Sequence, residues 1–312
     1  MAEPTTTEDP QGNWQEWAVD RAFRGMIRTA LALPWERRVA MMGWLMRRVV
    51  APRAGWRNRA LANMAYIWPD MPLSEREALA DRVAENVGRT IVENYDVPGM
   101  LRRMGNEPLQ GDGVAALEQA RAEGRPVLFV TGHFGNHEAP RAALVARGYQ
   151  IGGLYRPMSN PYFNAHYAAN MHNLSGPVFE QGRRGTTGLV RHVRQGGMAA
   201  LLFDVYDSHG TPIDFLGKPA PTLTSAAEIA NRGDALMIPY FGRRRAGGLG
   251  LDAVIEAPIP KGDPVEMMRE ATQRLEARIA EDPEQWFWFH RRWKPKRQRR
   301  RAAAKMGPNP SP

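Results

Sequence analysis

The chain has 312 residues, of which 43% are hydrophobic and 24% charged, so it is long enough to bury a large core. It contains no cysteine, which excludes disulfides and cysteine-ligated metal sites. The formal charge of +9 is gathered at the ends: residues 291–312 carry nine Lys/Arg and no acid, and residues 11–60 carry ten Arg against three acids. Basic ends favour contact with an anionic surface, such as membrane lipid, nucleic acid or an acidic carrier protein.

The first third of the chain is predicted to be helical. Residues 1–12 are polar and predicted to be disordered, and they show no signal-peptide pattern. Residues 13–106 form a helical region in which tryptophans, methionines and arginines recur, and its longest uncharged apolar run, Val39–Met46, is too short to span a bilayer. Such helices are typical of an interfacial membrane anchor, and the alternative is a helical hairpin packed on the main domain.

Residues 107–294 alternate between strand and helix patterns. Strands are expected at 127–130, 148–154, 198–203, 235–241 and, at an edge, 249–256; helices are expected at 114–122, 138–146, 160–173, 187–194, 224–231 and 264–281. This order predicts an α/β domain with a central, largely parallel sheet flanked by helices. Residues 295–312 are predicted to be a basic, disordered tail that contacts anionic headgroups.

The segment Arg125–Glu138 is the strongest candidate for a site. Its apolar strand stops at Thr131-Gly132, and in open α/β sheets the chemistry lies at the carboxyl ends of strands, which is where His133 falls. The spacing of His133 and Glu138 fits a general base oriented by a carboxylate. This spacing also occurs by chance, so a structural role is the alternative, and His137 is expected to be a packing or solvent-facing residue.

Three further charged positions follow predicted elements. Arg156 comes after strand 148–154 and suits a phosphate or carboxylate ligand, or a structural ion pair with Glu138 or another acid. Arg183 and Arg184 lie in the glycine-rich start of a helix, which either binds an anion or is a plain helix start. Asp204 comes directly after strand 198–203, where it is either a functional carboxylate or a turn residue.

The aromatic residues of block 283–294 are expected to pack in the core and at interfaces, with the basic residues on a solvated or lipid-facing edge and His290 in a structural role. The seven histidines show no metal-ligand spacing such as H-E-x-x-H, so no metal is predicted. No nucleotide-binding fingerprint is present either, and no cofactor is predicted.

Three blocks of the chain resemble the bacterial lipid A biosynthesis late acyltransferases, the lauroyl and myristoyl transferases of the lysophospholipid acyltransferase superfamily. The block Gly132–Glu138 is similar to their G-H-F-G-N-W-E block, with His137 in place of Trp, and residues 155–161 and 283–294 match two more blocks. The resemblance implies a glycerolipid acyltransferase-like fold with N-terminal membrane-associated helices. It also implies a catalytic dyad of His133 and Glu138. The substrate-binding residues that it implies are Asn136, Arg156, Arg184 and Asp204.

The activity implied is transfer of a fatty acyl chain from an acyl carrier protein thioester to a hydroxyl of a lipid acceptor. The acceptor implied is a lipid A precursor of lipopolysaccharide biosynthesis, at the cytoplasmic face of the inner membrane. No Ser or Cys lies in the motif, which favours direct transfer over an acyl-enzyme. A lyso-aminolipid or lysophospholipid acceptor is the alternative. A basic nucleic-acid-binding protein is the alternative of another class, but no nucleic-acid motif is present, so no nucleic acid partner is expected.

Overall fold

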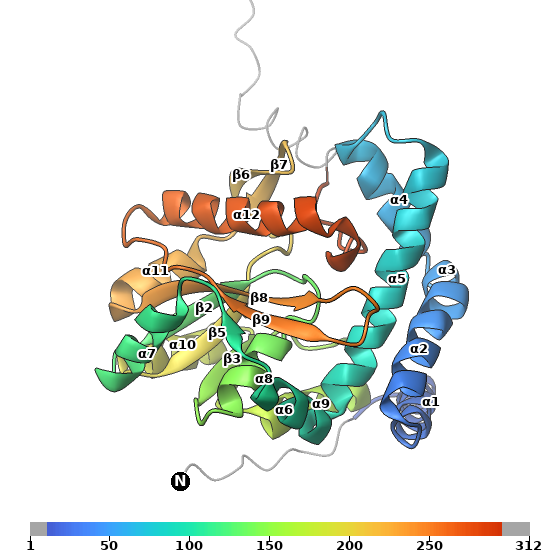
Figure 1. The fold of residues 1–312 in the computed structure, drawn as a ribbon, viewed down its shortest axis with the longest axis horizontal. Helices are drawn as coiled ribbons and strands as arrows, with labels where there is room; N and C mark the ends of the chain where they lie inside the picture. Colours follow the sequence, from blue (N-terminus) through green and yellow to red (C-terminus); the bar gives the residue numbers. More distant parts are fainter. Residues whose placement is uncertain (1–10, 295–312) are drawn as a thin grey trace, which may run out of the picture.

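The structure, a computed structural model, describes residues 11–294, and its centre is a seven-stranded sheet in the order β1-β9-β8-β2-β5-β3-β4 (Figure 1). Every neighbouring pair is parallel except β8 and β9, so the predicted α/β class with a largely parallel sheet is confirmed. The strands are β1 (Leu109–Gln110), β2 (Val127–Thr131), β3 (Ile151–Tyr155), β4 (Val178–Glu180), β5 (Met198–Leu202), β8 (Leu236–Arg244) and β9 (Leu251–Ile255).

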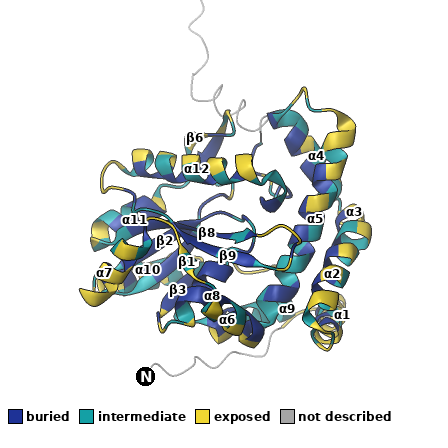
Figure 2. Cartoon of the chain, in the orientation of Figure 1, coloured by how far each residue is buried: buried dark blue, intermediate teal, exposed yellow. Residues whose placement is uncertain are grey.

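Helices cover both faces of the sheet, and β2 is buried along its whole length (Figure 2). Leu128 and Val130 point to the face that is covered by α10 (Arg183–Arg194), α11 (Ser225–Gly233) and α12 (Pro264–Glu281). Val127 and Phe129 point to the opposite face, which is covered by α7 (Val114–Ala122) and α8 (Ala139–Val145). An uninterrupted apolar run is what a strand buried on both faces requires.

Most of the N-terminal helices stand at one end of the sheet (Figure 1). These are α1 (Trp14–Leu31), α2 (Trp35–Leu45), a π-helical turn (Met46–Val50), α3 (Ala51–Arg53), α4 (Trp56–Ile67) and α5 (Leu73–Tyr95). The next helix, α6 (Val97–Asn106), packs on α8 instead. The helix α5 packs on α2 and α4. Among residues 11–294, no helix has the length and hydrophobicity needed to cross a bilayer.

Several elements were not expected from the sequence. An antiparallel hairpin of β6 (Thr211–Phe215) and β7 (Lys218–Thr222) turns through Leu216 and Gly217, which have φ values of 51° and 72°. Leucine is an unusual residue at positive φ, so the turn lacks the Asn-Gly or Asp-Gly signal that would have predicted it. The strands β1 and β4 are too short to show the alternating hydrophobic pattern by which a strand is recognised in a sequence. The predicted disorder lies outside the described residues, apart from residues 11–12.

Candidate active site

His133 lies where β2 ends, and a buried carboxylate on the next strand holds it. Thr131 and Leu202 are opposite one another in the parallel pair β2–β5, so His133 and Asp204, each two residues further along, meet at the same edge. The Oδ1 atom of Asp204 lies 2.7 Å from Nδ1 of His133. Its Oδ2 atom accepts hydrogen bonds from the His133 backbone N–H, at 2.8 Å, and from Nε1 of Trp286, at 2.9 Å.

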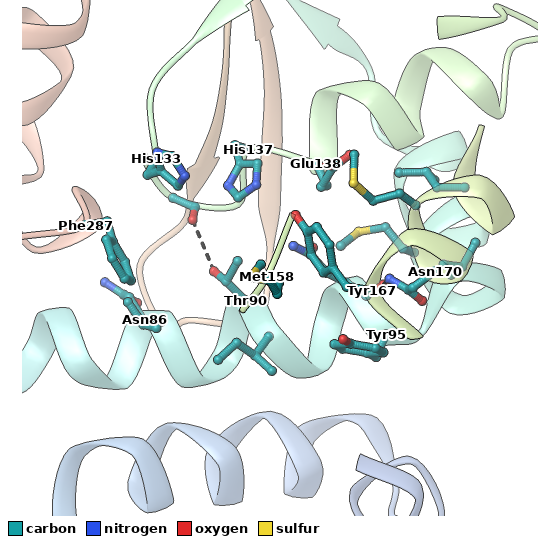
Figure 3. A pocket seen from close by; sticks show the side chains of 18 of the residues that line it. Asn86, Thr90, Tyr95, His133, His137, Glu138, Met158, Tyr167, Asn170 and Phe287 are labelled. Carbon is teal, nitrogen blue, oxygen red and sulfur yellow. Dashed lines mark hydrogen bonds between the residues drawn. The ribbon is translucent and has the colours of Figure 1, made fainter. Parts of the chain in front are cut away.

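The expected orientation of His133 by Glu138 is corrected by this geometry. Glu138 Oε2 pairs instead with Nη1 of Arg141, at 3.2 Å, and Glu138 is the N-cap residue of α8. The spacing of the two residues along one turn suggested a contact, but the neighbouring parallel strand brings a different carboxylate closer. Glu138 nevertheless lines the same cavity as His133 (Figure 3), so its catalytic role stays a prediction.

The electrostatics of the pair favour an ionised Asp204 and a basic Nε2 on His133. Asp204 is fully buried, which opposes ionisation, but the adjacent His133 ring and backbone N–H outweigh that penalty and lower the pKa of Asp204 below its usual range. A carboxylate bound to Nδ1 requires the proton on Nδ1, which leaves the lone pair on Nε2. The His133 side chain is 26% exposed, so a substrate can reach it.

Two further histidines surround the His133 ring. The ring centroids of His290 and His137 lie 4.3 Å and 5.4 Å from that of His133. Burial, and then repulsion from His133, lowers the pKa of His137 to about 4 and that of His290 to about 3, so both are neutral at pH 7. They therefore pack around the general-base candidate without adding positive charge next to it.

His133, Asp204 and His290 also form the kind of donor set that zinc accepts, because their ligand atoms lie within 4.8 Å of one another. In this geometry Nδ1 of His133 is already bound to Asp204, as a proton-transfer pair requires. The sequence-based prediction that the protein binds no metal is not tested by this arrangement.

A cavity of about 330 Å³ opens beside His133 (Figure 3). Its walls come mainly from α5, α6, α9 (Pro161–Leu174) and Phe287, with α1 contributing Phe23. Most of these side chains are apolar, among them Ile91, Met100, Met158, Phe163 and Leu174. The volume is at the lower end of the range for small-molecule pockets, about 300–1,000 Å³. An imidazole base thus borders a pocket that suits a hydrocarbon chain.

Comparison with known proteins agrees with this geometry. Residues 13–295 match the family model for bacterial lipid A biosynthesis acyltransferases. The chain belongs to that family. It is similar to a lipid A biosynthesis acyltransferase of Haemophilus influenzae, with 24% identity over 75% of this chain and 74% of the relative. It is also similar to the lipid A biosynthesis lauroyltransferase of Escherichia coli, with 25% identity over 74% and 77% of the two chains. For the myristoyltransferase of that organism, the identity is 21% over 75% and 73%. The family resemblance stated from the sequence blocks is confirmed.

In this lipid A acyltransferase family member, a buried ion pair fixes the loop that carries His133. Glu93 of α5 pairs with Arg244 of β8 through contacts of 2.5 and 2.7 Å, and both residues are buried. Glu93 also accepts a hydrogen bond of 2.8 Å from Nδ2 of Asn136, and the Thr90 hydroxyl donates to the Gly135 carbonyl at 3.1 Å (Figure 3). The loop is thereby attached to α5.

Asn136, which the family resemblance implies is a substrate-binding residue, takes part in this attachment. It is fully buried, its Nδ2 is bound to Glu93, and its Oδ1 accepts the backbone N–H of Glu138 at 3.1 Å. It is not among the residues that line the cavity. These contacts hold the loop in place, and the substrate-binding role of Asn136 stays a prediction. Glu93 and Arg244 were not identified from the sequence as part of this support. Glu93 lies in a helical pattern and Arg244 in a run of arginines, and neither pattern predicts that the two charges are buried together.

Arg156 and Arg184 lie on the same edge of the sheet as His133 but further out. Arg156 follows β3 directly, and Arg184 lies in the first turn of α10, just after β4. Both side chains are exposed, and neither forms a hydrogen bond or ion pair with another residue in the range 11–294. The alternative of an Arg156–Glu138 ion pair is thus not seen, and the substrate-binding roles of both arginines stay predictions.

The aromatic block near the C-terminus packs in the core, as expected, and also supports the site. Trp286 and Trp288 are fully buried, and Trp286 donates the third hydrogen bond to Asp204. One expectation is corrected: Arg292 is 1% exposed, not on a solvated edge, and donates to the Pro221 carbonyl at 2.7 Å and to the Thr222 hydroxyl at 2.5 Å. Burial lowers the pKa of Arg292 to about 10, so it is still charged at pH 7.

Proposed function

We propose that this protein transfers a fatty acyl chain from an acyl carrier protein thioester to a hydroxyl group of a lipid A precursor. The observation that carries the proposal is the His133–Asp204 pair, with its 2.7 Å contact, at the border of an apolar cavity. The pair supplies a base for an alcohol, and the cavity supplies a site for the chain that is moved. Family membership supports acyl transfer and a lipid A acceptor.

In the proposed mechanism Nε2 of His133 takes the proton from the acceptor hydroxyl. The oxygen forms a bond to the thioester carbonyl carbon, the carbon–sulfur bond breaks, and the imidazolium returns the proton to the departing thiolate. Asp204 stabilises the imidazolium and holds Nδ1 protonated throughout. The chain has no cysteine and the His133 loop has no serine, so the acyl group passes directly between the two substrates.

Glu138 takes a secondary role in this proposal. Its carboxylate is held by Arg141 at the wall of the cavity, where it can accept a hydrogen bond from the acceptor. Arg156 and Arg184 are exposed and have no side-chain partner within the described part of the chain, and they suit the phosphate groups of a lipid acceptor, since guanidinium groups bind phosphate through two parallel hydrogen bonds. None of these steps requires a cofactor.

We place the reaction at the cytoplasmic face of the inner membrane, where a lipid acceptor is accessible. Trp14, Trp17 and Trp44 are 75%, 48% and 54% exposed on α1 and α2, among arginines such as Arg28 and Arg37. Exposed tryptophans flanked by arginines are typical of helices that lie in the headgroup layer. The helix α1 borders the cavity through Phe23, so an acyl chain or acceptor would enter from that side.

The decisive experiment is incubation of the purified full-length protein with an acyl carrier thioester and candidate acceptors, followed by mass spectrometry of the lipids. The acceptors are a lipid A precursor, a lysophospholipid and a lyso-aminolipid, and His133→Ala is the control. We expect an added acyl chain on the lipid A precursor with the wild type alone. If one of the other acceptors were acylated instead, the proposed acceptor would be wrong. If no acceptor were acylated, the proposed activity would be wrong.

A further inference from the structure

The helix α10 carries an unusual set of charges for this protein. Its twelve residues include four arginines, one histidine and no acid. The four arginines are exposed, and none of their side chains forms a hydrogen bond or ion pair with another residue in the described part of the chain. Arginines elsewhere are often neutralised; Arg57 and Arg245, for example, each contact two carboxylates. The unpaired charge of α10 is therefore available to a partner.

Three of these arginines lie along one side of the helix. At 3.6 residues per turn, Arg183, Thr187, Arg191 and Arg194 fall within an arc of about 80°. We call these four residues the α10 stripe. The opposite side of the helix carries Leu189 and Val193, which are fully buried against the sheet. Packing thus fixes the helix with its cationic side outward.

The position of α10 links the stripe to the candidate active site. The helix begins three residues after β4, and β4, β3, β5 and β2 are successive parallel strands of the sheet. With about 4.8 Å between strands, the start of α10 lies roughly 14 Å from the strand that carries His133. The stripe runs from that edge back along the sheet (Figure 1). It covers about 16 Å, since a helix rises about 1.5 Å per residue.

We propose that the α10 stripe is the docking surface for the acidic face of an acyl carrier protein; this inference rests on the function proposed above. Three cations spread over about 16 Å match an extended acidic protein surface better than one phosphate group. A thioester on a flexible arm of about 14 Å or longer would reach the strand that carries His133 from a carrier bound at the start of α10. Arg184, which lies just beside the stripe at the catalytic edge, is left for the acceptor.

A membrane surface fits the stripe less well. Its outward side has no exposed apolar residue, whereas an interfacial helix buries an apolar side in the headgroup layer. The exposed tryptophans lie on α1 and α2, which Figure 1 shows at the other end of the molecule from most of α10. The structure thus separates a surface suited to lipid from a surface suited to a soluble, acidic partner.

The test is a charge reversal at the end of the stripe distant from His133, Arg191→Glu/Arg194→Glu. The matched control is Arg82→Glu/Arg102→Glu, which makes the same charge change at two exposed arginines on α5 and α6 that do not line the cavity. Steady-state kinetics with an acyl carrier thioester, and anisotropy titrations with the holo-carrier lacking an acyl chain, are measured for both variants. Thermal melts verify that both are folded.

For Arg191→Glu/Arg194→Glu we expect KM for the acyl carrier thioester and Kd for the holo-carrier to rise about tenfold or more, with a weaker salt dependence of binding. The control should bind the carrier as the wild type does. Reversing two acidic residues on the carrier to lysine should restore the variant's affinity. The inference would be overturned if KM and Kd were unchanged, or if the control lost as much affinity as the variant. It would also be overturned if the variant kept its affinity for the carrier but lost binding to vesicles of anionic phospholipid. A wild type that binds the carrier but transfers no acyl chain would instead overturn the proposed function.

Discussion

At the scale of single residues, the site depends on which carboxylate holds the imidazole. Asp204 accepts three hydrogen bonds, two of them from His133, whereas Glu138 is paired with Arg141. A group with that many donors is fixed in position and ionised, and it fixes the tautomer of its partner. The mechanism therefore assigns the orienting role to Asp204, and this assignment can be separated experimentally from the role of Glu138.

Asp204→Asn should reduce kcat/KM by about 10³-fold, because the amide cannot hold Nδ1 protonated and Nε2 basic at the same time. Glu138→Gln should cost about tenfold, the equivalent of one ordinary hydrogen bond. His133→Ala should remove measurable activity. Initial rates of acyl transfer, with circular dichroism as the check on folding, decide between them. A larger loss in Glu138→Gln than in Asp204→Asn would return the orienting role to Glu138.

The histidines around His133 predict how stability changes with pH. The pKa of His290 is lowered from 6.5 to about 3 by burial, so between these values the unfolded chain takes up a proton that the folded chain does not. This contribution is constant above about pH 6.5, and stability falls as the pH decreases below it, by at most about 1.4 kcal/mol per pH unit.

His290→Phe should reduce this acid sensitivity and leave stability at pH 7 equal or higher, because Nε2 of His290 is buried and has no hydrogen-bond partner among residues 11–294. Urea midpoints at pH 7 and pH 5 measure the effect. His209→Phe is the matched control, since the His209 side chain is 87% exposed. The interpretation fails if both variants keep the same acid slope as the wild type.

At the scale of elements, the sequence predicted what depends on local pattern and missed what depends on tertiary contact. The bounds of α7 and α12 and the strand β2 followed from their periodicity and apolar runs. The partner of His133 did not, because only the pairing of β2 with β5 brings Asp204 to it. The family blocks located His133, but no pattern along the chain distinguished a buried Asn136 from a substrate-binding one.

The buried ion pair between α5 and β8 should be the most sensitive contact between two elements. Glu93→Gln leaves the guanidinium of Arg244 without its counter-charge in the core, which typically costs about 3–5 kcal/mol. The double variant Glu93→Leu/Arg244→Met removes both charges and should recover a large part of that loss. Denaturant unfolding of the two variants gives the free energies. A double variant that is less stable than Glu93→Gln would show that the hydrogen bonds to Asn136 and Thr90, and not the charge, carry the stability.

At the scale of the whole molecule, the proposed reaction uses two surfaces and the cavity beside His133. In that proposal the exposed tryptophans of α1 and α2 contact lipid, the α10 stripe binds an acidic carrier, and the cavity holds the acyl chain. This arrangement brings a soluble donor and a membrane acceptor to one base from different sides. It implies that attachment to lipid can be removed without removing the chemistry.

Trp14→Ala/Trp17→Ala should weaken binding to anionic vesicles by at least about tenfold, because two large aromatic side chains no longer enter the headgroup layer. In detergent solution, where acceptor and enzyme mix freely, the same variant should transfer acyl chains as the wild type does, since neither residue lines the cavity. Leu73→Ala/Leu249→Ala removes exposed apolar side chains elsewhere and should bind vesicles normally. Vesicle sedimentation and detergent-based rates are compared for both variants. Equal vesicle binding by both would mean that α1 is not the surface that contacts lipid.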